Sequence, residues 1–373
     1  MTIDRRSFLA ASLALAADTD ATQDDWQGVE RVVAVGDVHG DKDALAAVLR
    51  MAGVIDEKED WIGGSAHLVQ IGDVPARGPQ TRKAFDLLMR LEQQAAGAGG
   101  KVHALIGNHD AGVIYGDLRN TLREEYGEFQ EPRSQERLET AFAEEVAERR
   151  RAGRLTSDPG ELDRLKAVWL ESHPPGFVEH REAFSPSGHY GSWIRRNNSV
   201  IRINDTLFVH GGISPKYAKR TRRELNSTIR RELADPARLL PGTASETQGP
   251  LWYRGLAEEE QSPPQIHLQG VLRFHGVRRI VIGHTVTRTA ILPRFGSRVV
   301  NIDLGLSRFF GRPPACLVLE TASQHVLHRG AKIPMPGARK SDLVAYLKAV
   351  EAADEQPSPV GRLIGELTQR SKA

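Results

Sequence analysis

The feature that most constrains this chain is an apolar run ending in glycine and two potential metal ligands, the segment VVAVGDVHG at positions 32–40. Its valines favour a buried strand. Gly36 and Gly40 permit a tight turn that a β-branched residue could not make. Alternate residues of an extended chain point to the same side, so we expect Asp37 and His39 to reach one ion together.

The same arrangement, an apolar run followed by glycine together with a polar ligand, returns four more times. The polar residues at these five places are Asp37 and His39, Asp73, Asn108 and His109, His210, and His284. α/β folds place their sites at the carboxyl ends of strands. Imidazole and oxygen donors together suit Mn, Fe or Zn better than Ca or Mg. A carboxylate can bridge two cations roughly 3.5–4 Å apart, which would activate water and clamp a phosphoryl oxygen. The pattern therefore predicts a pair of metal ions.

Strands and helices alternate through the first third of the chain. We expect strands over 31–35, 67–71 and 101–106, with amphipathic helices over 41–51 and 81–96 between them. This β-α-β-α-β order is typical of α/β layered folds. A second set of strands is expected over 199–203, 206–209, 279–282, 299–302, 315–319 and 325–328.

The first 28 residues are expected to be a signal peptide and a linker. Arg5 and Arg6 precede an apolar segment, Phe8 to Ala17, with a small-residue cleavage pattern at 14–16. Arg-Arg-x-Phe-Leu also resembles the twin-arginine export signal, which predicts a periplasmic or exported protein. The alternative is a disordered basic tail on a cytoplasmic protein.

The main domain is expected over 29–335, followed by a helical tail over 336–373. Charged helix formers dominate at about 116–191, which predicts a helical insertion hanging over the site. Its run Arg149–Arg151 is either a solvated helix face or a basic rim that attracts an anionic substrate.

Charge and cysteine content exclude several classes of protein. The formal net charge is +2, without the basic excess of a nucleic-acid binder, so no nucleic-acid partner is expected. The one cysteine, Cys316, excludes an intramolecular disulfide and a Cys-rich zinc module, and its apolar surroundings predict a core residue. No stretch reaches the ~20 apolar residues of a membrane-spanning helix.

The ordered blocks GDVHG, GDVPARG, GNHD, HGG and GHT resemble the calcineurin-like metallophosphoesterase superfamily. Within it the chain resembles the bacterial-type, Shewanella-like phosphoprotein phosphatases, through positions 79–91, GDLR at 116–119, the run 188–193 and PLWYRG at 250–255. The resemblance implies two packed mixed β-sheets flanked by helices, an α/β fold. It also implies a dinuclear-metal phosphoesterase acting on a phosphopeptide or a small phosphomonoester.

The resemblance also implies roles for nine residues. One metal would be held by Asp37, His39 and Asp73, and the other by Asp73, Asn108, His210 and His284. His109 would protonate the leaving-group oxygen, while Arg77 and Arg254 would grip the phosphate. A planar guanidinium suits that task because it can bind two phosphate oxygens at once.

Two positions depart from the family pattern. Ala76 stands where the family usually carries an Asp that orients the general-acid histidine, and Asp110 stands in place of the usual Glu. A leaving group that needs less protonation should suffer less from the missing Asp. We therefore expect aryl phosphates, phosphotyrosine included, to be favoured over alkyl ones. The alternatives are a phosphodiesterase or dinucleotide hydrolase on the same metals, and a non-catalytic phosphate-binding protein. Asp303 is a further residue that could lie near the site.

Overall fold

A computed structural model describes residues 23–155, 158–235, 241–258, 263–287 and 289–369. The predicted signal peptide, including its arginine pair and cleavage pattern, lies outside the described residues. The expected linker over 18–28 is described only from residue 23. Within it, Asp25 and Trp26 form a short strand paired with Arg202 and Ile203.

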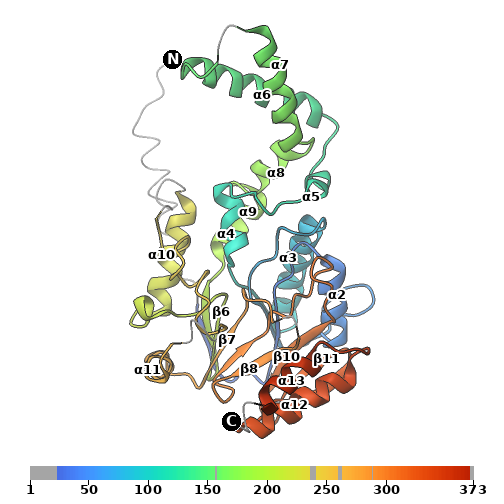
Figure 1. The fold of residues 1–373 in the computed structure, drawn as a ribbon, viewed down its shortest axis with the longest axis vertical. Coiled ribbons are helices and arrows are strands. Elements are labelled where there is room, and N and C mark those ends of the chain that lie inside the picture. Colours follow the sequence, from blue (N-terminus) through green and yellow to red (C-terminus); the bar gives the residue numbers. More distant parts are fainter. Residues whose placement is uncertain (1–22, 156–157, 236–240, 259–262, 288, 370–373) are drawn as a thin grey trace.

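Two mixed β-sheets, each of six strands in the described residues, form the centre of the molecule (Figure 1). The first sheet has the order β12-β11-β10-β2-β3-β4, with bounds Ala331–Pro334, Gln324–His328, Ala315–Glu320, Arg31–Val35, His67–Gln70 and Lys101–Ala104. The second has the order β1-β5-β6-β7-β9-β8, with bounds Asp25–Trp26, Val200–Ile203, Thr206–Val209, Arg279–Ile282, Val299–Asn301 and Leu292–Arg294. The predicted fold class, two mixed sheets flanked by helices, is confirmed.

Strand β2 shows why the apolar runs are continuous. Val32 and Ala34 belong to the core between the sheets, whereas Val33 and Val35 belong to the core that includes the helices of the outer face. A strand covered on both faces needs apolar residues at every position rather than at alternate ones. Helices α2 (Lys42–Met51) and α3 (Thr81–Gly97) provide the outer cover of this sheet.

Helices from the C-terminal half of the chain cover the outer face of the second sheet and pack against the core between the two sheets. Leu225 of α10 (Arg222–Ala234) and Leu268 of α11 (Gln265–His275) pack in the core outside the second sheet, and η1 (Pro215–Tyr217) adds Tyr217. Helices α12 (Lys340–Ala353) and α13 (Val360–Gln369) contribute side chains to the inter-sheet core.

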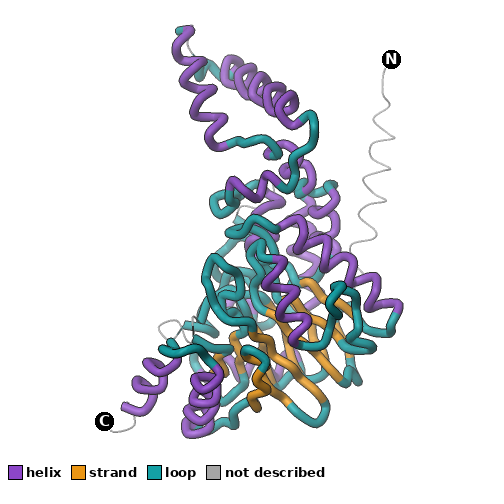
Figure 2. The backbone as a smooth tube through the Cα atoms, turned by 90° about the vertical axis from the view of Figure 1, so that its right-hand side faces the viewer, coloured by secondary structure: helices purple, strands orange, loops and turns teal. Residues whose placement is uncertain are grey.

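A run of helices separates β4 from β5. These are α4 (Asn108–Tyr115), α5 (Arg123–Gly127), α6 (Ser134–Arg151), α7 (Pro159–Ser172), α8 (Phe177–Ala183) and α9 (His189–Arg196). Helices α6 and α7, which we call the arm, project away from the sheets (Figures 1 and 2). Their own small core, which includes Phe142 and Trp169, holds them together. The expectation that the insertion hangs over the site is therefore wrong for the arm.

Two further observations concern expectations from composition. Cys316 is a buried free cysteine in β10, as predicted, and burial raises the pKa of its thiol to about 12. Among the described helices, none combines the length and the apolar character that crossing a membrane requires.

Candidate active site

The loops that follow β2, β3, β4, β6 and β7 meet at one edge of the two sheets and bring together the polar residues selected from the sequence. Glycines allow the loops to approach closely. A Cβ added to Gly107 would lie 2.3 Å from Asp73 Oδ1, and one added to Gly283 would lie 2.5 Å from Asp37 Oδ1. Any side chain at these two positions would displace a carboxylate.

The backbone at the site is unusual. Five residues that are not glycine have a positive φ: His39 (48°), Asp73 (58°), Ala76 (70°), Arg77 (63°) and His284 (65°). Such left-handed conformations cost roughly 1–3 kcal/mol each and persist only where the surrounding structure imposes them. Their concentration at the carboxyl edge of the strands marks this edge as functional.

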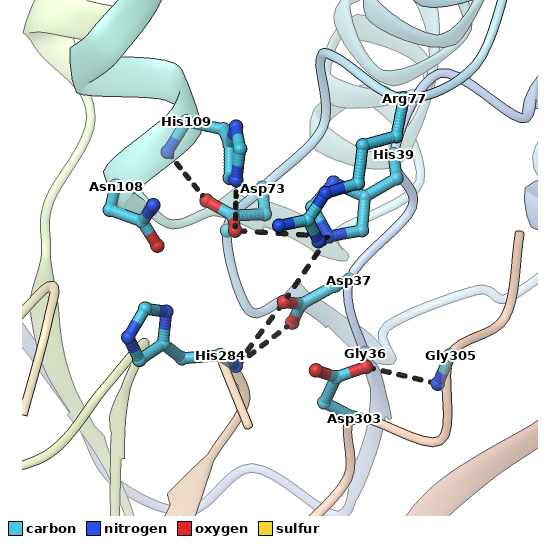
Figure 3. Close-up of polar contacts among 12 residues, drawn as sticks. Gly36, Asp37, His39, Asp73, Arg77, Asn108, His109, His284, Asp303 and Gly305 are labelled. Carbon is cyan, nitrogen blue, oxygen red and sulfur yellow. Dashed lines mark hydrogen bonds and ion pairs between the residues drawn. The ribbon is translucent and has the colours of Figure 1, made fainter. Parts of the chain in front are cut away.

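Asp73 lies at the centre of the cluster (Figure 3). Its Oδ2 atom is 3.3 Å from His210 Nε2 and 3.9 Å from the Nε2 atoms of both His39 and His109. Its other oxygen accepts a 2.8 Å hydrogen bond from the backbone N–H of His109. Ligand atoms converge in two sets that share this residue, one with His39 and His109 and one with His210 and His284. Asp73 therefore has the position of a shared ligand.

The histidine rings are oriented by backbone carbonyls. His39 Nδ1 lies 3.4 Å from the carbonyl oxygen of Pro75, and His210 Nδ1 lies 3.1 Å from that of Ile71. A proton on Nδ1 in each ring leaves the Nε2 lone pair facing Asp73, an arrangement typical of metal-ligating histidines. His284 uses the opposite atom, since its Nε2 lies 3.1 Å from the carbonyl oxygen of Trp252.

Asn108 and Asp37 complete the set. Asn108 Oδ1 is 3.0 Å from His210 Nε2, and Asp37 Oδ2 is 3.9 Å from His39 Nε2. Both oxygens of Asp37 also accept from the backbone N–H of His284, at 3.3 and 3.2 Å. The six candidate ligands are thus together in the described structure.

Asp303, which the sequence marked only as a possible neighbour, lies in the same cluster (Figure 3). Its Oδ1 accepts from the backbone N–H of Gly305 at 3.0 Å, while Oδ2 is buried without a hydrogen-bond partner among the described residues. The signal was present in the sequence, because Asp303 follows the strand 299–301 as the other ligands follow theirs. An orphaned carboxylate oxygen beside Asp37 fits a site that accepts a cation.

The electrostatics of the cluster also suit cations. Burial, together with the neighbouring carboxylates of Asp303 and Asp73, raises the pKa of Asp37 well above its usual value. Burial raises the pKa of Asp303 to about 6. Burial lowers the pKa of His39 to about 3, which favours the neutral imidazole. Buried carboxylates and neutral imidazoles are the donors that Mn, Fe or Zn would take.

The three residues expected to act on the phosphate line a cavity of about 290 Å³ beside the cluster. His109, Arg77 and Arg254 share its wall with Asp73, Asn108 and His284. Arg254 donates to the carbonyl oxygen of His284 and to Thr285 Oγ1, both at 3.0 Å, which holds its guanidinium at the rim. Burial lowers the pKa of His109, an effect that the carboxylate of Asp73 opposes.

Residues from the start of the insertion border the same cavity and were not selected from the sequence. They are Asp117, Arg119 and Asn120. Arg119 donates twice to Asp117, at 2.7 and 2.6 Å, and the carbonyl oxygen of Asn120 accepts from the backbone N–H of Arg77. The GDLR block at 116–119 was the available signal. The insertion thus contributes its first residues to the site.

The two departures from the family pattern have different structural consequences. Ala76 is buried and offers no carboxylate to His109. Asp110 accepts from the backbone N–H groups of Asp73 and Gly107, at 2.7 and 2.8 Å, and so fixes the loop of the central carboxylate. Asp110 is committed to the backbone in this way and does not substitute for the missing carboxylate.

Comparison with known proteins agrees with this geometry. A family model described as calcineurin-like phosphoesterase matches residues 30–288. The chain belongs to the calcineurin-like phosphoesterase family. It is therefore a metallophosphoesterase, and its candidate ligands fit the metal ions on which this family depends.

Two relatives of this phosphoesterase are named as protein phosphatases. It is 27% identical to Shewanella-like protein phosphatase 2 of Arabidopsis thaliana, over 78% of this chain and 75% of the relative. It is 22% identical to Shewanella-like protein phosphatase 1 of Plasmodium berghei, over 77% and 70% of the two chains. The predicted branch of the superfamily is confirmed.

Two solved structures that resemble this fold are also phosphatases. A cold-active protein tyrosine phosphatase structure matches with a TM-score of 0.66 and 27% identity, covering 88% of this chain and 84% of that one. The cold-active protein-tyrosine phosphatase of a psychrophilic Shewanella species matches with a TM-score of 0.64 and 28% identity, covering 84% and 82%. The phosphoesterase is thus similar in fold and sequence to tyrosine phosphatases.

Proposed function

We propose that this phosphoesterase hydrolyses phosphomonoesters with the help of two metal ions and prefers aryl esters, phosphotyrosine included. One observation carries the proposal: a carboxylate shared by two sets of imidazoles lies beside a cavity whose wall includes Arg77, Arg254 and His109. The tyrosine phosphatases among its structural neighbours support the same substrate class.

The proposed metal ligands keep Asp73 as the residue shared by two sets, with Asp37 taking the place of His109 in the first set. Asp37, His39 and Asp73 would hold one ion, and Asp73, Asn108, His210 and His284 the other. When bound, the ions would act as Lewis acids on the phosphate and on the attacking water. The carbonyls of Pro75, Ile71 and Trp252 would keep the three imidazoles turned toward the ions.

The protein's own contribution to the reaction lies with three side chains. Arg77 and Arg254 would hold the phosphate oxygens and orient the ester, since a guanidinium offers two parallel donors. His109 would give a proton to the leaving-group oxygen as its bond to phosphorus breaks. Without a carboxylate at position 76, this proton transfer is less well supported, which favours leaving groups that depart readily as anions, such as aryl oxides.

The test is a substrate panel on purified protein stripped with a chelator and then supplied with Mn, Fe or Zn. We expect p-nitrophenyl phosphate and phosphotyrosine peptides to be hydrolysed after metal addition and not before. Bis-p-nitrophenyl phosphate should be a poor substrate, because a phosphodiester has one non-bridging oxygen fewer to accept from the arginines. Faster hydrolysis of the diester, or metal binding with no turnover of any ester, would contradict the proposal.

A further inference from the structure

An exposed aromatic side chain lies next to the phosphate-binding arginine. Large hydrophobic side chains are exposed at five described positions, Ile62, Val168, Ile266, Phe274 and Phe309. Phe309 is 59% exposed, and its ring centroid is 5.9 Å from Cζ of Arg77. An exposed ring so close to an expected substrate-binding residue calls for a functional explanation.

The ring of Phe309 packs against the ring of the neighbouring Phe310. The two rings meet edge to face, with centroids 5.0 Å apart and planes at 84°. Phe310 is half-buried, with its ring 5.7 Å from that of His39. Gly305 leaves room for it, because a Cβ there would lie 2.8 Å from Cβ of Phe310. The loop after β9 therefore holds Phe310 beside the metal-ligand cluster, and Phe309 packs on Phe310.

The rings of Phe309 and Phe310 form an aromatic wall, and Arg77 lies between this wall and the metal-ligand cluster. Its Cζ lies 5.4 Å from the centroid of Phe310, and its Nη1 lies 2.8 Å from His39 Nε2. A guanidinium over aromatic faces has a restricted orientation and gains cation–π stabilisation. The guanidinium is therefore held in one orientation next to the aromatic wall, where it can bind an anion.

We propose that Phe309 determines specificity by packing against the aromatic ring of an aryl phosphate while Arg77 holds the phosphate group. The inference rests on the proposed function and names a residue responsible for its substrate preference. In an aryl phosphate only the bridging oxygen separates the ring from phosphorus, so a phosphate held by Arg77 on the side of the two phenylalanines would place that ring against Phe309. A phosphoserine ester presents a methylene group there and has no face to offer.

The size of the effect follows from the strength of aromatic pairs. Edge-to-face or offset contacts contribute about 0.5–1.5 kcal/mol beyond simple burial, which corresponds to about 2- to 13-fold in a rate or binding constant. For Phe309→Ala we expect kcat/KM for a phosphotyrosine peptide to fall by about that factor more than kcat/KM for the phosphoserine peptide of the same sequence. Phe309→Tyr, which keeps the ring, should retain the wild-type ratio.

Two further measurements sharpen the test. Inhibition constants of phenylphosphonate and methylphosphonate report binding without turnover, and the preference for the phenyl compound should shrink in Phe309→Ala. Phe274→Ala is the matched control, since Phe274 lies on α11 and is 46% exposed. It should leave both peptide rates unchanged.

The outcomes separate the inference from the function on which it rests. An active enzyme whose aryl-to-alkyl ratio is the same in wild type and Phe309→Ala overturns the inference alone. Wild-type protein that hydrolyses neither peptide nor p-nitrophenyl phosphate, with metals supplied, overturns the proposed function and the inference together.

Discussion

Asp73 is the residue on which most of the proposed chemistry depends. It is the carboxylate common to both ligand sets, and four imidazoles surround it. Asp73→Asn keeps the size of the side chain and removes its charge. We expect kcat to fall by roughly a hundredfold or more, the effect of losing a central electrostatic stabiliser. Steady-state kinetics and elemental analysis should show loss of activity together with loss of bound metal.

A matched control for this substitution exists on the arm. Asp163 is an exposed carboxylate of α7, and Asp163→Asn should leave both rate and metal content at wild-type levels. Near-normal turnover in Asp73→Asn would show that the assignment of Asp73 is wrong.

Ala76 gives a second prediction, about the leaving group. Its φ of 70° lies in the left-handed region, which Asp adopts more readily than Ala, so the backbone here is compatible with a carboxylate. Ala76→Asp should support proton transfer from His109 and raise turnover of phosphoserine peptides by roughly tenfold, part of the usual contribution of a general acid. Turnover of p-nitrophenyl phosphate should change much less. Ala76→Asn, of equal size but uncharged, is the control, and equal gains on both substrates in Ala76→Asp would count against the leaving-group argument.

Some of these residues could be chosen from the sequence because a local pattern identifies them. A glycine and a ligand after an apolar run place Asp37, Asp73 and His284 at a strand end without knowledge of the rest. Phe309 could not be found in this way, since it reaches the site through a loop whose path depends on distant contacts. The left-handed backbone of His39 was equally hidden, because the surrounding fold imposes it against local preference.

Secondary structure shows the same division between local and distant causes. The strands β2, β6 and β7 begin and end where predicted, because continuous runs of buried, mainly apolar residues bounded by turn residues mark them. The strands β1, β8 and β12 were missed. They are short edge strands of two to four residues, and β8 and β12 contain proline, which is tolerated at an edge. Their pairing depends on the sheet already being present.

Helices α5 and α8 contain a buried acid–base pair that predicts pH-dependent stability. Glu125 Oε1 lies 3.2 Å from His180 Nε2, and both side chains are fully buried. Burial raises the pKa of Glu125 to about 8 and lowers the pKa of His180 to about 3. Because the folded protein keeps the Glu125 proton that the unfolded chain releases above about 4.5, this group stabilises the fold at low pH. That stabilisation is lost as the pH rises toward 8.

The effect of Glu125 is separated from that of His180 between pH 6.5 and 8, and the comparison of the wild type with Glu125→Gln separates it from other buried carboxyl groups. His180 has its effect below 6.5, where the unfolded imidazole takes up a proton. Between pH 6.5 and pH 8 the ionisation of Glu125 should lower the unfolding free energy of the wild type by roughly 1–2 kcal/mol. Glu125→Gln should lack this contribution. Urea unfolding at both pH values measures the difference. Glu124→Gln, an exposed neighbour on α5, should follow the wild type, and parallel pH curves for Glu125→Gln would contradict the assignment.

The arrangement of the whole molecule separates the chemistry from the arm. The candidate ligands lie on loops that meet at the same edge of both sheets. Among the described residues of the insertion, only Asp117, Arg119 and Asn120, at its start, line the cavity. The arm itself extends beyond α8 and α9 (Figure 1). Its direction could not be predicted, because charged helix formers specify helices without specifying where they pack.

Because the arm is separate from the site, we expect the basic residues at the end of α6 to have little effect on catalysis. Arg150, Arg151 and Arg154 are exposed near the junction of α6 and α7, and none of them lines the cavity. Charges far from a site act on a small anion only through a field that falls off over about 8–10 Å at physiological salt. Replacing all three by Ala should therefore leave kcat/KM for p-nitrophenyl phosphate within about twofold at 0.15 M salt. A loss of kcat/KM that grows at low ionic strength would instead favour a basic rim that attracts the substrate. Arg77→Ala is the positive control, since removal of an arginine at the cavity wall should weaken turnover at every salt concentration.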